Sequence, residues 1–224
     1  MIGAAVLSAA LALVYGIVGP AWADAGVAKA ILAALKASCI VVLAGLALAH
    51  GARLLAAALL FGATGDALLA LDTQTSFLTG AGAFLIGHLC YIALFLRSGA
   101  GAMSLAQPPR LFGALAMVAA AIAGTMWLVP AESPLFAPLS VYTGVLTFMA
   151  ISTFTLPAAR WLVMLGGVLF FVSDGFVAHN MFHTAADPRT AFALSFIGWM
   201  IYWAGQAALC LGALTLRPSR ATPR

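Results

Sequence analysis

Long apolar segments follow one another along the whole chain, and their length is the feature that most restricts the fold. A helix that crosses the hydrocarbon core of a bilayer needs about 20 mostly apolar residues. Clusters of proline, glycine and charged residues divide the chain into eight segments of roughly this length. The segments are residues 2–19, 27–49, 53–72, 76–96, 110–130, 135–156, 160–182 and 190–216. The sequence therefore predicts an all-α integral membrane protein, a single bundle of about eight transmembrane helices.

The composition leaves no room for a soluble domain beside this bundle. Of the 224 residues, 64% are hydrophobic and 7% are charged, whereas soluble domains carry about 25% charged residues. We therefore expect residues 1–224 to form one transmembrane domain. The lysines and arginines form no basic run, so nucleic acid is not an expected partner. The cysteines form no C-x-x-C pair, so neither a disulfide framework nor a zinc site is indicated.

The first apolar segment has an alternative interpretation. It is followed by AWADA, which resembles a signal-peptidase cleavage site. However, residues 2–18 are long for the apolar part of a signal peptide, and no lysine or arginine precedes them. We therefore expect the first helix to be retained.

Basic residues are distributed unevenly between the two sides of the predicted bundle. One side receives Arg53, Arg97, Arg110, Arg160, Arg217, Arg220 and Arg224. The other side receives two basic residues and four acidic ones, namely Lys29, Arg189, Asp24, Asp72, Glu132 and Asp187. Short loops rich in lysine and arginine stay in the cytoplasm. We predict that both termini are cytoplasmic and that the protein lies in the cell membrane, the inner membrane of a bacterium.

Six polar side chains from six of the segments share one layer of the membrane. At about 1.5 Å per residue, they lie between about 9 and about 18 Å from the outer ends of their helices. Charged groups this deep are costly in lipid and face protein or a water-filled cavity. The layer therefore predicts a functional site, and a lysine–aspartate pair that only locks two helices together is the structural alternative. The six residues are Lys36, Asp66, His88, Tyr142, Asp174 and Tyr202.

Helical spacing indicates which way these side chains point. Asp66 shares its face with small residues at four-residue intervals, and small residues let helices approach closely in lipid. We therefore expect Asp66 to face protein. Two other faces combine aromatic and polar residues; aromatic residues alone indicate packing more often, but the polar ones favour a lined pocket. These faces are Phe84, His88, Tyr91 and Phe95 in one segment, and Ser195, Trp199, Tyr202 and Gln206 in another.

Four sequence elements in order carry a family resemblance. They are LLFGATGDALLAL, FLIGHLCYIALF, LFFVSDGFVAHNMF and YWAGQAAL, which contain G-D, H-x-x-Y, S-D and Y-x-x-x-Q. Over residues 30–212 the chain resembles the lysoplasmalogenase (YhhN-like) family of multi-pass membrane proteins. The family usually has proline after the lysine of the second helix, where this chain has Ala37. The polar set of the family falls on Lys36, Asp66, His88, Tyr91, Tyr142, Ser173, Asp174, Tyr202 and Gln206.

The resemblance implies hydrolysis of the vinyl ether bond of lysoplasmalogens, which are lysophospholipids of the membrane. The products are a fatty aldehyde and glycerophosphocholine or glycerophosphoethanolamine, and no cofactor or metal is expected. The reaction protonates a carbon and adds water to an oxocarbenium ion, a demand that glycosidases meet with two carboxylates. Asp66 and Asp174 are the expected catalytic pair, one as general acid and the other as the anion; their order is left open. The other seven residues of the set would bind the substrate.

Two further interpretations concern the same polar residues. A small proton-coupled transporter is the main alternative, because intramembrane Asp, Lys and His form proton relays. LLFGATGD and VLFFVSD lie four segments apart and hint at a duplicated half, but the inner half offers little polar lining beyond Ser152 and Gln206. His179 and His183 have the spacing of metal ligands. They lack an H-E-x-x-H motif, and we expect no metal there.

Overall fold

The computed structural model describes residues 1–24, 28–99, 101–214 and 216, and within these residues all regular elements are helices. The predicted all-α bundle is therefore confirmed. Two short 3₁₀ helices, η1 (Ala102–Ala106) and η2 (Ala158–Arg160), lie in the connections before α5 and α7. The long helices are α1 (Ile2–Asp24), α2 (Lys29–Ala49), α3 (Arg53–Leu69), α4 (Gln74–Ser98), α5 (Pro108–Leu128), α6 (Phe136–Thr153), α7 (Trp161–Phe182) and α8 (Pro188–Ala213).

Seven of the helices in the described part of the chain are long and apolar enough to cross a membrane. This confirms the multi-pass character that the apolar segments predict. The remaining helix, α3, has 17 residues, the lower end of the length that spans a hydrocarbon core of about 30 Å. It is shorter than the predicted segment 53–72 because the chain turns at residues 70–72, where Asp72 has a φ of 53°. Aspartate adopts this left-handed conformation more readily than most residues.

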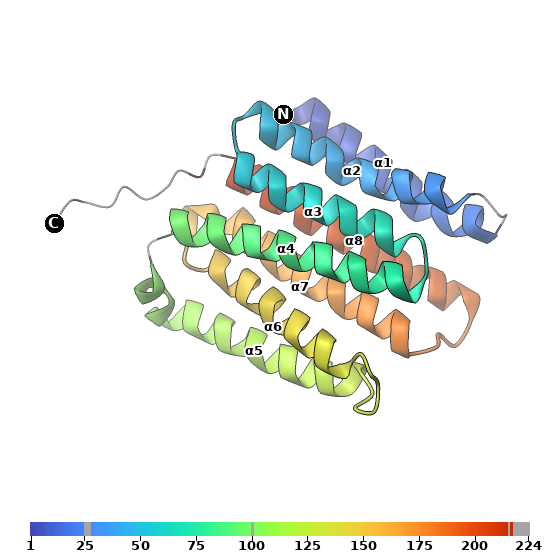
Figure 1. The fold of residues 1–224 in the computed structure, drawn as a ribbon. Coiled ribbons are helices and arrows are strands. Elements are labelled where there is room, and N and C mark those ends of the chain that lie inside the picture. The colour runs from blue at the N-terminus through green and yellow to red at the C-terminus, as the bar shows by residue number, and fades with distance from the viewer. Residues whose placement is uncertain (25–27, 100, 215, 217–224) are drawn as a thin grey trace.

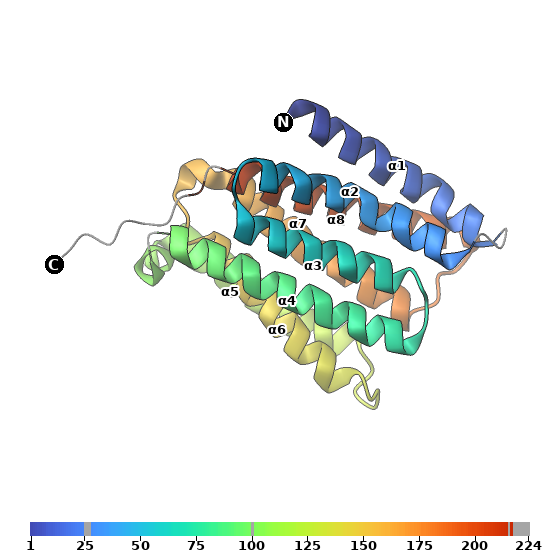
Figure 2. The same cartoon turned by 45° about the horizontal axis from the view of Figure 1, so that its top comes forward.

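The helices form a bundle in which consecutive helices lie side by side (Figures 1 and 2). Helices α1 and α2 form one edge of the bundle, and α5 and α6 form the opposite edge. Helices α3, α4, α7 and α8 fill the space between these edges, with α8 packed against α1, α2, α3 and α7. Any site that draws on all the helices must therefore extend across the bundle.

Helices α7 and α8 approach each other closely at two glycines. A Cβ atom on Gly166 of α7 would lie 2.9 Å from the carbonyl oxygen of Gly205 on α8. Likewise, a Cβ on Gly205 would lie 3.0 Å from the backbone nitrogen of Phe170. Small residues of this kind allow backbone contact between helices in lipid. The contact fixes the position of α7 relative to α8.

Helix α1 is connected to α2 and α8 by side-chain hydrogen bonds. The Trp199 Nε1 donates to the Ala12 carbonyl oxygen over 2.8 Å, and the Trp203 Nε1 donates to Ser8 Oγ over 2.9 Å. Ser8 Oγ in turn donates to the carbonyl oxygen of Cys39 in α2 over 2.8 Å. A retained first helix makes these contacts; its retention in the cell stays a prediction.

The charged residues of the connections gather at the two ends of the bundle. The antiparallel order of the helices brings Arg53, Arg97, Arg110 and Arg160 to one end. At the other end, Lys29 Nζ lies 3.5 Å from Asp72 Oδ2. Arg217, Arg220 and Arg224 lie outside the described residues, as does the side chain of Asp24. Which end faces the cytoplasm stays a prediction.

Asp187 caps the N-terminus of α8 at the end of the bundle that carries Asp72. Its Oδ2 accepts a hydrogen bond from Thr190 Oγ1 over 2.7 Å, and its Oδ1 accepts from the backbone nitrogens of Thr190 and Arg189. These donors, the Thr190 hydroxyl above all, hold the pKa of the Asp187 carboxyl below its usual value. The cap is therefore strongest when the carboxyl is ionised.

We expect Asp187→Ala to lower the thermal unfolding midpoint of the detergent-solubilised protein at neutral pH. The ionised carboxylate stabilises the wild type above the unfolded-state pKa, and this contribution is lost as the pH falls through the lowered folded-state pKa. The difference between the two proteins should therefore shrink at acid pH. A difference that stays constant or grows on acidification would contradict the cap.

Candidate active site

A cavity of about 660 Å³ lies in the half of the bundle that contains the C-terminal ends of α3, α5 and α7. Its volume falls in the range of about 300–1,000 Å³ that is typical of small-molecule sites. The exposed Asp72 is among the residues that line it, so the cavity reaches the surface at this end of the bundle. Every long helix contributes to the lining, and one residue from each, α1 to α8, is Tyr15, Lys36, Asp66, Phe84, Leu128, Tyr142, Asp174 and Tyr202.

Asp66 lies on α3 with 2% of its surface exposed and is among the residues that line the cavity. Gly62, one turn earlier, makes room for α8, because a Cβ there would lie 2.8 Å from Gln206 Nε2. The Tyr202 hydroxyl donates a hydrogen bond to Asp66 Oδ2 over 2.7 Å. The face of small residues thus directs Asp66 toward protein.

A chain of hydrogen bonds behind the cavity orients the Tyr202 hydroxyl. The Tyr91 hydroxyl donates to Gln206 Oε1 over 2.7 Å, and Gln206 Nε2 donates to Tyr202 Oη over 3.1 Å. Tyr91 and Gln206 are both buried, each with 1% of its surface exposed. Because the amide of Gln206 donates to the Tyr202 oxygen, the hydrogen of Tyr202 is left to point at Asp66.

Asp174 on α7 accepts a hydrogen bond in the same way from α6. The Tyr142 hydroxyl donates to Asp174 Oδ2 over 2.6 Å, and His88 Nε2 lies 3.2 Å from Tyr142 Oη. With the tyrosine hydrogen directed to the carboxylate, this contact is a hydrogen bond when His88 donates from Nε2. His88 Nδ1 is then a buried acceptor without a hydrogen-bond partner in the described part of the protein. Ser173 Oγ donates to the carbonyl oxygen of Phe170 over 2.6 Å and lies 3.5 Å from Asp174 Oδ1.

Lys36 lines the cavity from α2 between two aromatic rings. Its Nζ lies 5.8 Å from the ring centre of Tyr15 and 5.6 Å from that of Trp199, within the range of cation–π interactions. All of these residues are described, and no carboxylate oxygen of Asp66 or Asp174 lies within 4.0 Å of Nζ. Lys36 and Asp66 therefore form no direct ion pair but still interact electrostatically over a longer distance, so the role of this pair stays a prediction. Helix α2 continues regularly through Ala37.

Known proteins match this chain over most of its length. Residues 31–213 match the model of the YhhN family. The chain belongs to the YhhN family. Proteins named lysoplasmalogenase from Mycobacterium bovis (strain ATCC BAA-935 / AF2122/97) and Mycobacterium tuberculosis (strain CDC 1551 / Oshkosh) are each 32% identical to it over 186 residues, which cover 80% of this chain and 69% of theirs. No solved structure matches the chain significantly. The resemblance seen in the four sequence elements is confirmed.

The structure divides the polar set of the YhhN chain into two groups. Six members line the cavity, and their roles in the reaction stay a proposal. His88, Tyr91 and Gln206 are not among the lining residues; they lie buried behind it and reach it through the hydrogen bonds of Tyr142 and Tyr202. The lining members are Lys36, Asp66, Tyr142, Ser173, Asp174 and Tyr202.

Other lining residues were not singled out from the sequence. Tyr15 of α1 lies before the matched range of the YhhN family and nevertheless contacts Lys36. The sequence feature that could have identified Tyr15 is that it is an aromatic residue in a largely aliphatic segment. Helix α5 contributes a run of small residues, among them Ala120, Ala121 and Gly124. The sequence feature that could have identified them is the contrast between these small residues and the large apolar residues on the other face of the same helix.

His179 and His183 lie at the C-terminal end of α7 in this YhhN protein. Their rings stack with centres 5.2 Å apart. Within residues 1–24, 28–99, 101–214 and 216, no group of three or more metal-ligating side chains comes together. The geometry of this histidine pair therefore supplies too few ligands for a metal site.

Proposed function

We propose that this YhhN protein is a lysoplasmalogenase that hydrolyses the vinyl ether bond of lysoplasmalogens with Asp66 and Asp174 as its acid–base pair. The observation that carries the proposal is that Asp66 and Asp174 line one cavity and each carboxyl accepts a hydrogen bond from a tyrosine hydroxyl. The name of the mycobacterial relatives supports the substrate class. The expected products are a fatty aldehyde and glycerophosphocholine or glycerophosphoethanolamine.

The reaction consumes one water, and its protons pass through both carboxyl groups. One carboxylic acid gives its proton to the alkene carbon remote from the ether oxygen, and the alkene electrons form the new C–H bond. Water adds to the resulting oxocarbenium carbon and gives a proton to the other carboxylate. The hemiacetal then collapses: the second carboxyl returns its proton to the glycerol oxygen as the C–O bond breaks, and the hemiacetal hydroxyl gives its proton to the first carboxylate as the C=O bond forms. Both carboxyl groups are thereby restored. Glycosidases use paired carboxylates for the same kind of cation.

The remaining polar residues hold the two carboxyls in place. Tyr202 and Tyr142 each fix one carboxylate oxygen, and the second oxygen of Asp174 lies 3.5 Å from Ser173 Oγ. Phe84 lines the cavity, with its ring centre 5.9 Å from that of Tyr202. An aromatic face attracts a cation, so Phe84 is placed to stabilise the oxocarbenium ion. His88 and Gln206 act as positioning residues for the two tyrosines.

A proton-coupled carrier is less well supported by the same geometry. Its polar groups would have to continue through the inner half of the bundle. There, Ser152 Oγ donates to the Met149 carbonyl of its own helix over 2.6 Å. Gln206 uses its amide oxygen and nitrogen on Tyr91 and Tyr202. These inner polar groups are thus satisfied within the protein, whereas the outer ones line a cavity.

The charge distribution supports a location and an orientation. With its arginine-rich end in the cytoplasm, the protein would lie in the cell membrane with both termini cytoplasmic. The cavity would then open toward the outer leaflet, where Asp72 marks its mouth. Substrate would enter from that leaflet.

The protonation step can be tested by hydrolysis of a lysoplasmalogen in D₂O. The aldehyde, trapped at once by reduction, should carry one deuterium on the carbon next to the carbonyl carbon, because this carbon receives the catalytic proton. The rate should also be lower than in H₂O, since proton transfer to carbon limits it. Authentic aldehyde taken through the same steps measures background exchange. Aldehyde without deuterium above that background would refute the route, and absence of aldehyde altogether would favour the carrier.

A further inference from the structure

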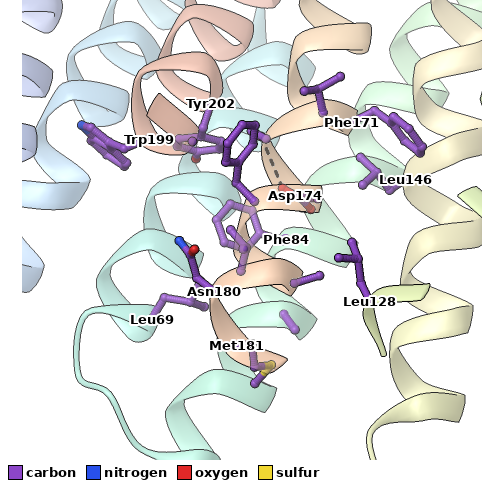
Figure 3. Close-up of a pocket in the computed structure, with 18 of the residues that line it drawn as sticks. Leu69, Phe84, Leu128, Leu146, Phe171, Asp174, Asn180, Met181, Trp199 and Tyr202 are labelled. Atoms are coloured by element: carbon purple, nitrogen blue, oxygen red, sulfur yellow. Dashed lines mark hydrogen bonds between the residues drawn. The ribbon is translucent and has the colours of Figure 1, made fainter. Parts of the chain in front are cut away.

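The cavity extends across the bundle, and its two ends differ in chemistry. One end lies between α1, α2 and α8, and the other lies against α5 and α6, at the opposite edge of the bundle (Figure 1). In Figure 3, Asp174 lies between Leu128 and Leu146 on one side and Tyr202 and Trp199 on the other. The proposed catalytic group thus lies between a polar end and an apolar end.

The polar end contains a lysine whose ammonium group makes no direct ion pair. The Lys36 side chain makes no hydrogen bond or ion pair within 4.0 Å with any residue that the structure describes. Tyr15 and Trp199 give it cation–π contacts, and Asp66 interacts with its charge over a longer distance. Lys36 is half-buried, and when a ligand displaces water from its ammonium group, an anion or hydrogen-bond acceptor must take the place of that water. Because Lys36 lines the cavity, that anion can come from a ligand within it. A phosphodiester has the required charge and acceptor oxygens.

At the apolar end, most of the side chains of α5 that line the cavity are small and leave space inside it. Helix α5 lines it with small residues, and a Cβ added to Gly124 would meet no atom within 4 Å. Leu128 and Leu146 complete this surface with carbon atoms. Most large side chains of α5 instead face outward, where lipid would cover them. They are Leu111, Phe112, Leu115, Val118, Ile122, Met126 and Trp127.

We propose that the lysophospholipid binds in one direction, with its phosphate at Lys36 and its hydrocarbon chain along Ala121 and Gly124 of α5. The vinyl ether joins these two parts of the substrate, so this direction places it beside Asp66 and Asp174. The reverse direction would put the phosphate beside Leu128, Leu146 and the two threonines Thr125 and Thr143, where no lining residue is cationic, and leave Lys36 facing hydrocarbon. The proposal rests on the proposed function and assigns a part of the substrate to each end of the cavity.

The phosphate half is tested with two saturated ether probes, 1-O-hexadecyl-lysophosphocholine and 1-O-hexadecylglycerol. Binding is followed by tryptophan fluorescence of the protein in nanodiscs. Lys36→Met should weaken binding of the phosphate-containing probe about tenfold or more, the loss of one charge-assisted contact. It should leave binding of hexadecylglycerol unchanged. Lys29→Met is the matched control, because this lysine pairs with Asp72 and is not a lining residue.

The chain half is tested by filling the apolar end. Gly124→Phe should weaken binding of 1-O-hexadecyl-lysophosphocholine about tenfold or more, because several methylenes lose their burial. Binding of the octyl analogue should change little. Gly144→Phe is the matched control, since Gly144 is an exposed glycine of α6 that does not line the cavity and has no atom within 4 Å of an added Cβ. Gly124→Leu gives a smaller obstruction, and unfolding midpoints show that each variant is folded.

The results separate the binding direction from the chemistry. If Lys36→Met weakens both probes equally, or Gly124→Phe and Gly124→Leu affect both chain lengths equally, the proposed direction is overturned. Saturated ethers have no alkene to protonate, so these measurements do not depend on turnover. A protein that binds the probes as expected but releases no aldehyde from lysoplasmalogen would contradict the proposed function and leave the binding direction in place.

Discussion

Asp66→Asn and Asp174→Asn should each lower the rate of aldehyde release from lysoplasmalogen by about two to four orders of magnitude, the usual contribution of a general acid or base. An amide has nearly the same size as the carboxyl but can neither give nor take the catalytic proton. Its carbonyl oxygen can still accept the hydroxyl of Tyr202 or Tyr142. The variants should therefore remain folded and lose chemistry rather than substrate binding.

The measurement is aldehyde release by purified protein in detergent, together with the thermal unfolding midpoint and binding of a saturated ether analogue. Glu132→Gln, a change of the same kind at an exposed loop residue, should keep wild-type activity. Turnover near the wild-type rate in either aspartate variant would exclude the two-carboxylate mechanism. Loss of folding together with activity would instead support a structural role for the carboxyl.

Gly166→Val should lower the stability of the folded protein substantially, because it disrupts the contact between α7 and α8. The new Cβ would lie 2.8 Å from the Leu209 backbone nitrogen and 2.9 Å from the Gly205 carbonyl oxygen. Backbone atoms cannot move aside without shifting a helix, and overpacking of this kind costs about 1–3 kcal/mol or more. Because the free energy of unfolding of a native protein is only about 5–15 kcal/mol, we expect a clearly lower unfolding midpoint. We also expect a smaller monodisperse fraction after extraction into detergent.

The control for this prediction is Gly45→Val on α2. Gly45 is exposed, and an added Cβ meets no atom within 4 Å, so the substitution should leave the midpoint nearly unchanged. Activity should fall with stability in Gly166→Val, because α7 carries Asp174 and α8 carries Tyr202. An unchanged midpoint in that variant would show that the helices can separate at low cost.

The bundle and the layer of polar groups could be predicted from the sequence because both depend on local properties. Whether a segment crosses a bilayer is decided by its own length and apolar content. The depth of Asp66 or Asp174 follows from counting residues along its helix. The inward direction of Asp66 follows from the small residues on its face, and Gly62 indeed admits Gln206 of α8. The end of α3 was predicted less well, because the turn before α4 depends on the backbone of Asp72.

The partners of each carboxyl were decided only by the tertiary structure. Tyr202 donates to Asp66 across 136 residues of chain, and Tyr142 donates to Asp174 across 32. Both tyrosines lie in the same layer, so depth alone could not assign them. The assignment depends on the rotation of each helix about its axis, which close contacts such as that of Gly166 with Gly205 determine.

The position of the cavity also decides which members of the polar set line it and which helices close it. His88 and Gln206 share faces with the lining residues Phe84 and Tyr202, but each lies one helical turn further from the open end of the cavity. Tyr15 of α1 and Gly124 of α5 line the cavity because those helices close its two ends. Hydrophobicity along the chain determines that a helix enters the membrane, whereas packing between helices determines which of its side chains meet.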